Sequence, residues 1–251
     1  MTDHGTKGWA LILGAASAMA EHAGRVHAAR GDRLLLAGRS PEKLKAIEAD
    51  LLARGASEVK TVIADLSETS DIAGRLLDWL DGASLERCYI FFGVLGDQSQ
   101  AEADLAAAHD LMNVNYTAPS LWSLAAANVL EKQRAGALVA ITSVAGDRGR
   151  MSNAIYGSAK AGLSTLVQGI DHRLAKHGAK AVGIKFGFVI SPMTEGMNRS
   201  GFLWTPAEKA GQLCVAAGDK ARGLIYAPFF WRFIMLIIRL VPTFVFNKTK
   251  L

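Results

Sequence analysis

The sequence predicts a single α/β domain in which a parallel sheet of about seven strands carries helices on both faces. The chain has 251 residues, and 50% of them are hydrophobic, which suits one large core. No linker, internal repeat or low-complexity segment divides it. Short apolar runs alternate with helical stretches, a pattern typical of parallel sheets. We expect strands at Trp9–Gly14, Leu34–Ala37, Val59–Ala64, Tyr89–Gly93, Leu138–Thr142, Ala181–Phe186 and Leu224–Tyr226.

The first apolar run leads directly into a turn and a helix. Trp9–Gly14 is continuously apolar and ends in a glycine, as expected for a strand that is buried on both faces. Ser17–Arg30 then has the pattern of a helix. A strand, a glycine turn and a helix N-terminus together form an anion site, because free backbone N–H groups there face a pyrophosphate.

A tyrosine and a lysine lie four residues apart in Met151–His177, a segment that we expect to be helical. Tyr156 and Lys160 therefore lie on one helix face. A neighbouring ammonium favours phenolate, so Lys160 is expected to lower the Tyr156 pKa from its usual value near ~10, as a general acid at neutral pH requires. Ser143 ends the apolar strand upstream, where parallel sheets place ligands. An ordinary helix with a surface lysine and a half-buried tyrosine would give the same pair.

Together these residues resemble the short-chain dehydrogenase/reductase family, and the resemblance covers nearly the whole chain. The catalytic tetrad pattern of that family is complete, as Asn115, Ser143, Tyr156 and Lys160. The family's glycine pattern Thr-Gly-x-x-x-Gly-x-Gly is represented by Leu13–Ala20, which retains only Gly14. The resemblance implies a Rossmann-type doubly wound sheet and an NAD(P)-dependent oxidoreductase.

The resemblance also implies a role for each member of the tetrad. Tyr156 would donate a proton to the developing alkoxide, and Ser143 would hold the substrate oxygen in line. Lys160 would depress the Tyr156 pKa and hold the nicotinamide ribose. Asn115 would anchor a water through which protons reach Lys160, although a helix-interior asparagine that bonds locally is the alternative.

Further positions match the cofactor site of the family. Phe186-Gly187 replaces a Pro-Gly pair, and Ser191 stands where a threonine usually meets the nicotinamide carboxamide. Ala18 replaces a glycine, so its methyl group is expected to crowd the pyrophosphate. The expected cofactor-binding residues are Gly14, Ser17, Ala18, Met19, Arg39, Asp65, Leu66, Gly93, Tyr156, Lys160, Gly187, Val189 and Ser191. No metal is expected, because the six His residues show no ligand spacing.

The end of the second expected strand favours NADP (NADPH) over NAD. Members of the family that prefer NAD usually place an acid there for the ribose hydroxyls, whereas this chain has Arg39 and no acid. The guanidinium could pair with a 2′-phosphate, or Arg39 could simply precede a helix that opens at Pro41. Asp65 matches the position that meets the adenine, and it could also cap a helix that starts at Ser67.

A narrower resemblance is to the branch of the family that reduces a polyprenyl-phosphate-linked 2-keto-pentose supplied by a flavin-dependent oxidase. It rests on Phe92–Asp97, Asn115–Ala118, Tyr156–Gly162 and Tyr226–Pro228, followed by an apolar tail with spaced arginines. It implies that oxidase as a partner, and we expect a homo-oligomer, a dimer or tetramer. Two alternatives remain: a reductase of another hydrophobic ketone, such as a 3-oxoacyl or steroid compound, and a dinucleotide-binding partner without turnover.

Charge and cysteine content exclude other classes. The net charge is +5, and it is unevenly distributed. Residues 1–219 hold 22 basic and 23 acidic groups, whereas the segment from Lys220 onward holds six basic residues and no acidic one. Those residues interrupt an apolar run, which argues against nucleic acid binding. Cys88 and Cys214 lie in or near apolar sequence and are expected to be buried thiols. Thr2–Gly8 is polar and lacks the pattern of a signal peptide, so we expect a cytoplasmic protein.

The C-terminal segment is expected to lie on a membrane surface without crossing it. Leu224–Val241 is mostly apolar, but Arg232 and Arg239 interrupt it and Pro228 and Pro242 bracket it, which leaves a helix too short for a ~30 Å bilayer core. An apolar stripe is expected at Phe230, Phe233, Ile234, Ile237 and Ile238. The alternative is a segment that closes the substrate pocket or packs on a second subunit. Accordingly, 1–227 is expected to form the reductase domain, with a substrate loop at about 188–206, and 228–251 to belong to the same domain.

Overall fold

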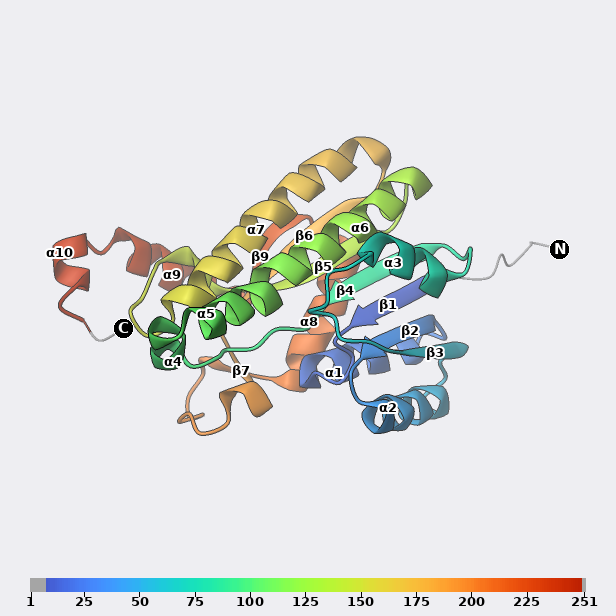
Figure 1. The fold of residues 1–251 in the computed structure, drawn as a ribbon, viewed down its shortest axis with the longest axis horizontal. Coiled ribbons are helices and arrows are strands. Elements are labelled where there is room, and N and C mark those ends of the chain that lie inside the picture. The colour runs from blue at the N-terminus through green and yellow to red at the C-terminus, as the bar shows by residue number, and fades with distance from the viewer. Residues whose placement is uncertain (1–7, 250–251) are drawn as a thin grey trace.

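The computed structural model describes residues 8–249 and contains a seven-stranded parallel sheet (Figure 1). The strand order is β3-β2-β1-β4-β5-β6-β9. From β1 the chain adds β2 and β3 on one side, and from β4 onward it adds strands on the other side, so the order switches between the neighbouring strands β1 and β4. All seven expected strands are present. Their bounds are β1 Trp9–Leu13, β2 Arg33–Gly38, β3 Glu58–Ile63, β4 Leu85–Ile90, β5 Ala137–Ser143, β6 Lys180–Phe186 and β9 Gly223–Ala227.

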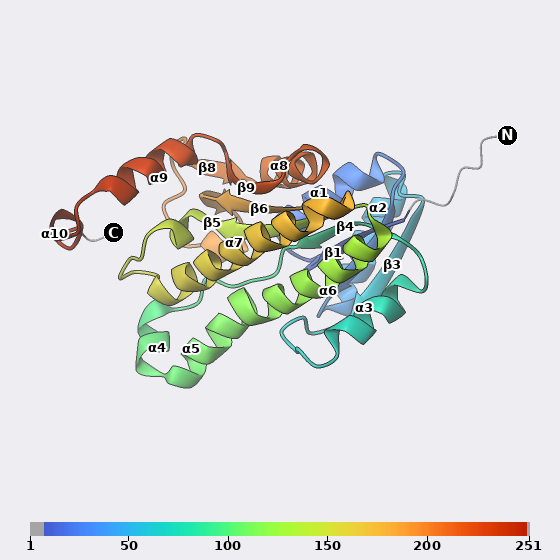
Figure 2. The same cartoon turned by 90° about the horizontal axis from the view of Figure 1, so that it is seen from above.

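Helices cover both faces of the sheet, as the view from above shows (Figure 2). On one face the core is formed with α3 (Ile72–Leu80), α6 (Ala118–Gln133) and α7 (Ala154–Leu174). On the other it is formed with α1 (Ala18–Ala28), α2 (Pro41–Ala53) and α8 (Ala207–Lys220). This is the doubly wound arrangement that the alternation of apolar runs predicted.

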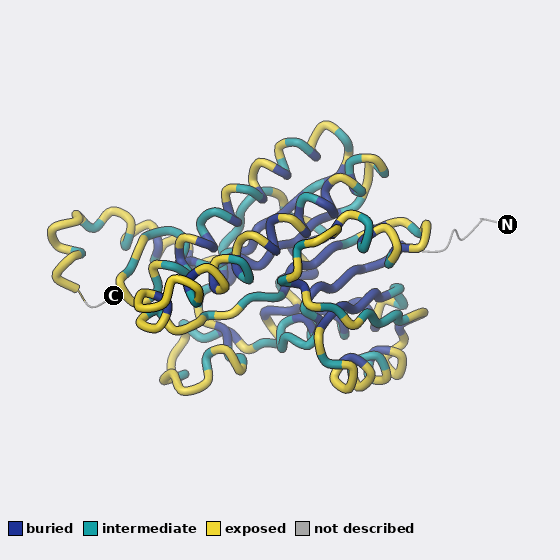
Figure 3. The backbone as a smooth tube through the Cα atoms, viewed as in Figure 1, coloured by how far each residue is buried: buried dark blue, intermediate teal, exposed yellow. Residues whose placement is uncertain are grey.

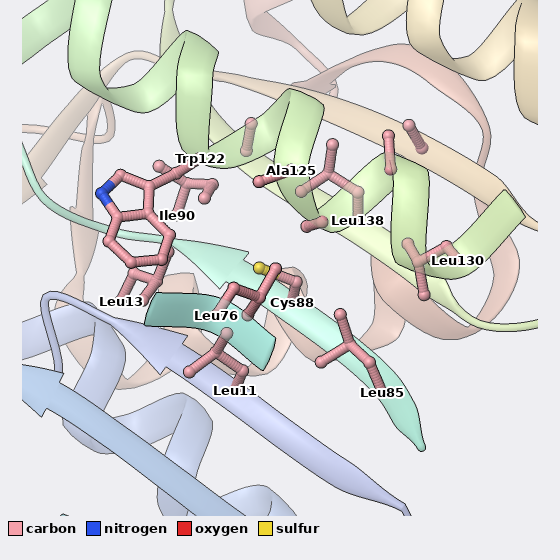
Figure 4. Packing of buried hydrophobic residues seen from close by; sticks show 14 of the residues in the cluster. Leu11, Leu13, Leu76, Leu85, Cys88, Ile90, Trp122, Ala125, Leu130 and Leu138 are labelled. Carbon is pink, nitrogen blue, oxygen red and sulfur yellow. The ribbon is translucent and has the colours of Figure 1, made fainter. Parts of the chain in front are cut away.

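The two cores follow from the alternation of side chains along each strand. In β1, Leu11 and Leu13 point into one core, and Ala10 and Ile12 into the other. Figure 4 shows the first core, where Trp122 of α6 lies over the strands. Its indole N–H donates to the Leu66 carbonyl at 3.1 Å, which satisfies the one polar atom of the ring. The inner strands β1, β2, β5 and β6 are consequently buried over nearly their whole length (Figure 3), whereas the edge strand β3 has no buried residue.

Some expected boundaries differ from the structure. The expected strand Tyr89–Gly93 begins earlier and ends at Ile90, because β4 has no ladder partner beyond that residue. The helix expected over 151–177 is α7, extended by a 3₁₀ turn at Ala175–His177. The helix expected at Ser67 is absent: Asp65 accepts from the Ser67 backbone N–H at 2.9 Å in a tight turn, and α3 begins only at Ile72. Both cysteines are buried free thiols.

Smaller elements border the carboxyl ends of the strands. They include α4 (Gln98–Ala103), α5 (Leu105–Met112) and the π-helical turn Asn113–Thr117 between α5 and α6. In the expected substrate loop, β7 (Phe188–Ile190) pairs in parallel with β8 (Trp204–Pro206). The chain ends in α9 (Trp231–Leu240) and α10 (Thr243–Phe246), which extend from one end of the molecule in both views (Figures 1 and 2).

The C-terminal helix is docked through a different face from the one expected. Trp231 and Met235 of α9 are buried against Val144, with Ile234 and Ile238 packed beside them. The expected stripe is therefore split, because Phe233 and Ile237 point away from the protein and are 55% and 67% exposed. No helix in residues 8–249 is long and apolar enough to cross a membrane. Residues 2–7 of the polar N-terminal stretch, and Lys250, lie outside the described range.

Docking of α9 depends on a glycine at the end of β6. A Cβ placed on Gly187 would lie 1.9 Å from Cε2 of the Trp231 indole. We expect Gly187→Ala to lower the free energy of unfolding by about 1–3 kcal/mol, because the buried ring has to move. Urea denaturation measures the change. The control is Gly169→Ala in α7, where an added Cβ meets nothing within 4 Å and should stabilise the helix by about 0.5–1 kcal/mol. Equal effects of the two substitutions would contradict the packing argument.

Candidate active site

The residues singled out from the sequence meet at the carboxyl ends of β1, β4, β5 and β6. The sheet order changes direction between β1 and β4, and open α/β sheets bind ligands at such a point. Gly14 follows β1, Gly93 follows β4, Ser143 ends β5 and Gly187 follows β6. The fold therefore gathers into one region residues that are far apart in the sequence.

The turn after β1 requires glycine and leads into a helix N-terminus. Gly14 has φ of +84°, and a Cβ there would lie 2.8 Å from the backbone nitrogen of Phe92. Ser17 is the N-cap residue of α1, and its side chain makes no capping hydrogen bond. Ala18 and Met19 form the first helical turn, where backbone N–H groups lack intrahelical partners. The turn thus offers N–H groups and a hydroxyl to an anion, as expected.

Gly93 brings two members of the tetrad against the end of β4. A Cβ on Gly93 would lie 2.9 Å from Asn115 Oδ1 and 3.3 Å from Lys160 Nζ. Only a glycine leaves room for both side chains beside the backbone. The need for a glycine directly after β4 is therefore explained by the two side chains that pack against it.

Asn115 is fully buried in the π-helical turn Asn113–Thr117. Its amide nitrogen donates to the carbonyls of Val94 and Leu111, both at 2.9 Å, and its Oδ1 accepts from the Val94 N–H at 3.2 Å. The side chain thus fixes the loop after β4. π-helical turns of this kind occur frequently at functional sites.

The hydroxyl of Ser143 lies within hydrogen-bonding reach of the Tyr156 phenol and so acts to lower the pKa of that phenol. Two glycines allow the segment after β5 to pack directly on α7. A Cβ on Gly157 would lie 2.8 Å from the Ala145 carbonyl, and one on Gly146 would lie 2.7 Å from the Ala161 nitrogen. The role of these two glycines was not predicted from the sequence, although both are next to expected site residues.

Lys160 is buried on the same side of α7, one turn after Tyr156. Its ammonium donates to the Ile141 carbonyl at 3.2 Å and lies 5.8 Å from the centre of the Tyr156 ring. Burial lowers the pKa of Lys160 to about 8. A group with this pKa exchanges its proton readily near neutral pH.

The pKa of Tyr156 differs in direction from the expectation. Burial raises it, and the hydrogen bond from Ser143 opposes that rise. The ammonium of Lys160 lies over the ring rather than against the hydroxyl, so desolvation of the phenolate prevails. Ser143, which the sequence suggested only as a substrate ligand, is therefore also the residue that favours the phenolate.

The remaining expected cofactor residues line the same edge of the sheet. Arg39 is exposed directly after β2. The pKa of Asp65 is lowered first by its hydrogen bonds with Ser67 and to a smaller extent by the charge of Arg39, so the two side chains lie within electrostatic reach. Leu66 and Val189 are buried. Ser191 begins a 3₁₀ turn in which its backbone N–H donates to Thr194 Oγ1 at 3.3 Å.

A second polar cluster, which sequence reasoning missed, lies next to Ser143. Asp147 is buried, pairs with Lys185 of β6 and accepts from the Tyr226 hydroxyl of β9 at 2.7 Å. Arg148 donates to the carbonyls of Ile238 and Val241 at the end of α9, both at 2.6 Å. The signal in the sequence was Asp147-Arg148 directly after an apolar strand, but their partners lie far along the chain.

These features fit a bound dinucleotide. The glycine turn and the first turn of α1 suit a pyrophosphate, and the glycine after β4 keeps the backbone clear of the Lys160 ammonium. Beside them, a hydrogen-bonded pair of hydroxyls and a buried lysine can hold a carbonyl oxygen and supply a proton. No group of three or more His, Cys, Asp or Glu within residues 8–249 could hold a metal ion. The fold and the site define a dinucleotide-dependent oxidoreductase.

Comparisons with known proteins agree. The family model described as short chain dehydrogenase matches residues 8–200. The chain is 33% identical to an uncharacterized oxidoreductase of Mycobacterium tuberculosis over 88% of each chain, and 26% identical to a 3-oxoacyl-[acyl-carrier-protein] reductase of Synechocystis over 86% of this chain and 91% of the other. Levodione reductase is similar in fold, with a TM-score of 0.78, 21% identity and coverage of 88% and 96%. The chain belongs to the short-chain dehydrogenase/reductase family and is an NAD(P)-dependent oxidoreductase.

We expect Lys160→Met to stabilise the protein at neutral pH. Because burial holds the Lys160 pKa near 8, below its unfolded value of ~10.4, the charged side chain destabilises the fold fully below pH 8, and this effect fades as the pH rises towards ~10.4. After loss of the bond to Ile141 is counted, the gain at pH 7 should be about 2 kcal/mol. Urea denaturation at pH 7 and pH 10 measures it.

The matched control for this substitution is Lys132→Met, which changes an exposed lysine on α6. It should leave the free energy of unfolding within about 0.5 kcal/mol of wild type at both pH values. A gain for Lys160→Met that did not shrink at high pH would show that the buried charge is not its source.

Proposed function

We propose that the protein is an NADPH-dependent carbonyl reductase that reduces the keto group of a polyprenyl-phosphate-linked sugar of the 2-keto-pentose type. The observation that carries the reaction class is the Ser143–Tyr156 hydroxyl pair beside the buried Lys160. The observation that favours this substrate is the resemblance of segments around the tetrad to decaprenylphosphoryl-2-keto-pentose reductase. A flavin-dependent oxidase would then supply the ketone as a partner, and the enzyme would work in the cytoplasm at the inner face of the membrane.

The site residues divide the reaction between them. A nicotinamide cofactor, when bound at this site, would supply the hydride for the carbonyl carbon. The Ser143 hydroxyl holds the carbonyl oxygen, and Tyr156 gives its proton to that oxygen as negative charge develops there. The high Tyr156 pKa keeps the phenol protonated until then. The resulting phenolate is then reprotonated, and Lys160, with its pKa near 8 and its ammonium 5.8 Å from the centre of the ring, is a group from which a proton can be relayed to it.

A second candidate is a reductase of another hydrophobic ketone. The similarity to a 3-oxoacyl-[acyl-carrier-protein] reductase favours it, because that relative covers most of this chain. The two candidates share the site and differ only in the substrate. Substrate turnover is therefore the measurement that separates them.

We expect NADPH oxidation with the polyprenyl-phosphate-linked keto-pentose, generated by a flavin-dependent oxidase, and little with a 3-oxoacyl thioester or a steroid ketone. Tyr156→Phe should lower the rate at least ~10²-fold, because a placed proton donor contributes that much. Tyr116→Phe makes the same chemical change on a ring that is 40% exposed and should keep the rate. Turnover of the thioester alone would identify the second candidate, and cofactor binding without any turnover would indicate a non-catalytic partner.

The cofactor preference is proposed to depend on Arg39. Its guanidinium stands directly after β2, while Ser40 caps α2 by accepting from the Lys43 N–H at 3.3 Å, so Ser40 and not Arg39 is the residue that begins the helix. A side chain that is exposed and not needed by the helix is free to pair with a 2′-phosphate. The absence of an acid at this strand end removes the usual partner of the NAD ribose.

We expect Arg39→Ala to weaken NADPH binding roughly ten- to hundredfold and to leave NADH binding nearly unchanged, because a charge-assisted bidentate contact contributes about 1.5–3 kcal/mol. Fluorescence titration with each cofactor measures both affinities. Lys43→Ala removes a neighbouring exposed positive charge from the first turn of α2 and serves as the control. Equal losses for NADPH and NADH in Arg39→Ala would assign Arg39 a structural role.

A further inference from the structure

The C-terminal arm, residues 229–249, carries exposed apolar side chains along the side that faces away from the protein. On α9 these are Phe233, Leu236, Ile237 and Leu240, which are 53–73% exposed. They lie at spacings of three, four and seven residues and so form one continuous face. Before the helix, Phe229 is 61% exposed and contacts the Phe233 ring edge to face, and after it Phe244 is 72% exposed.

The arm cannot fold this face back onto its own chain, because its opposite side is already held. Trp231 and Met235 are buried against the segment that follows β5. Arg148 binds the carbonyls that end α9, and its guanidinium lies 3.8 Å from the centre of the Phe246 ring. A helix that is apolar on both sides needs a second apolar surface to cover it.

Charge indicates what that surface is. Arg232 is exposed on α9 beside the outward apolar face, whereas the Arg239 side chain reaches back to the Tyr226 hydroxyl of β9. From Lys220 onward the sequence has no Asp or Glu, so a second copy of the arm would bring more positive charge and no counter-charge. Anionic lipid headgroups supply that counter-charge, and the acyl region beneath them receives the apolar side chains.

We propose that the arm docks on an anionic phospholipid surface through its outward apolar face, with Arg232 at the headgroups. With ten residues at ~1.5 Å each, α9 spans about 15 Å, half of a ~30 Å bilayer core, so it lies in the interface. Because α9 packs against Val144, next to Ser143, docking places the active site close to the membrane surface. This inference shares the membrane location of the proposed function but rests on the arm alone, so it can hold or fail whatever the substrate.

The test is co-sedimentation of the full chain with vesicles of phosphatidylcholine, with and without phosphatidylglycerol. The protein should sediment with the phosphatidylglycerol vesicles, and less so at high salt. Ile237→Glu should reduce binding at least tenfold, whereas Leu77→Glu, the same change at a 59% exposed leucine on α3, should not. Arg232→Gln should weaken binding about five-fold, and Lys132→Gln on α6 should leave it unchanged.

Three outcomes would overturn the proposal. The folded wild-type protein could ignore anionic vesicles, or Ile237→Glu could bind them as well as wild type. Alternatively, Ile237→Glu could dissociate a dimer, as shown by sedimentation velocity, without altering vesicle binding, which would make the face a contact between subunits. NADPH binding by Ile237→Glu, measured by fluorescence titration, keeps this test separate from that of the proposed function, since it reports on a folded site without a ketone or a membrane.

Discussion

The direct contact between α7 and the segment that follows β5 is the constraint on which the site depends. Gly146 and Gly157 permit it, because a side chain at either position would collide with the backbone of the other element. That contact sets the hydrogen bond between Ser143 and Tyr156, which come from different elements. It also carries Lys160 beneath the sheet edge, where its ammonium reaches the Ile141 carbonyl. Positioning of the reactive groups therefore follows from backbone packing as much as from side-chain chemistry.

Much of the fold could be predicted from the sequence, because the parallel sheet is buried on both faces and its strands read as continuous apolar runs. The segments β1, β5 and β6 are examples in which nearly every residue is buried. Three residues of the expected tetrad could be placed near one another from the sequence, because Ser143 ends such a run and Tyr156 and Lys160 share a helix face; Asn115 entered only through the family resemblance. The helix start expected at Ser67 was wrong. Asp65 instead closes a turn with Ser67, because its carboxylate accepts from the Ser67 backbone N–H and no helix is needed to satisfy that group.

Contacts between distant segments could not be predicted in this way. The direction in which the Tyr156 pKa shifts depends on burial and on where the Lys160 ammonium lies relative to the ring. The spacing of residues along the sequence gives neither of these. The face that α9 presents to the protein was also not predictable, because that helix is apolar on nearly every side and its pattern does not distinguish Trp231 from Phe233. In the structure, Trp231 is the residue that faces the protein, because its indole packs against Gly187, where there is no side chain to exclude it.

The segment Val144–Arg148 connects the chemistry to the C-terminal arm. Its first residue packs under α9, Asp147 joins β6 and β9 through Lys185 and Tyr226, and Arg148 holds the end of α9. Buried polar groups of this kind are costly unless each is paired, and here the pairing partners all come from the last third of the chain. A displacement of the arm would therefore be transmitted to the short segment that positions Ser143 beside Tyr156. The arm and the Ser143–Tyr156 pair thus share the segment Val144–Arg148 as a common support.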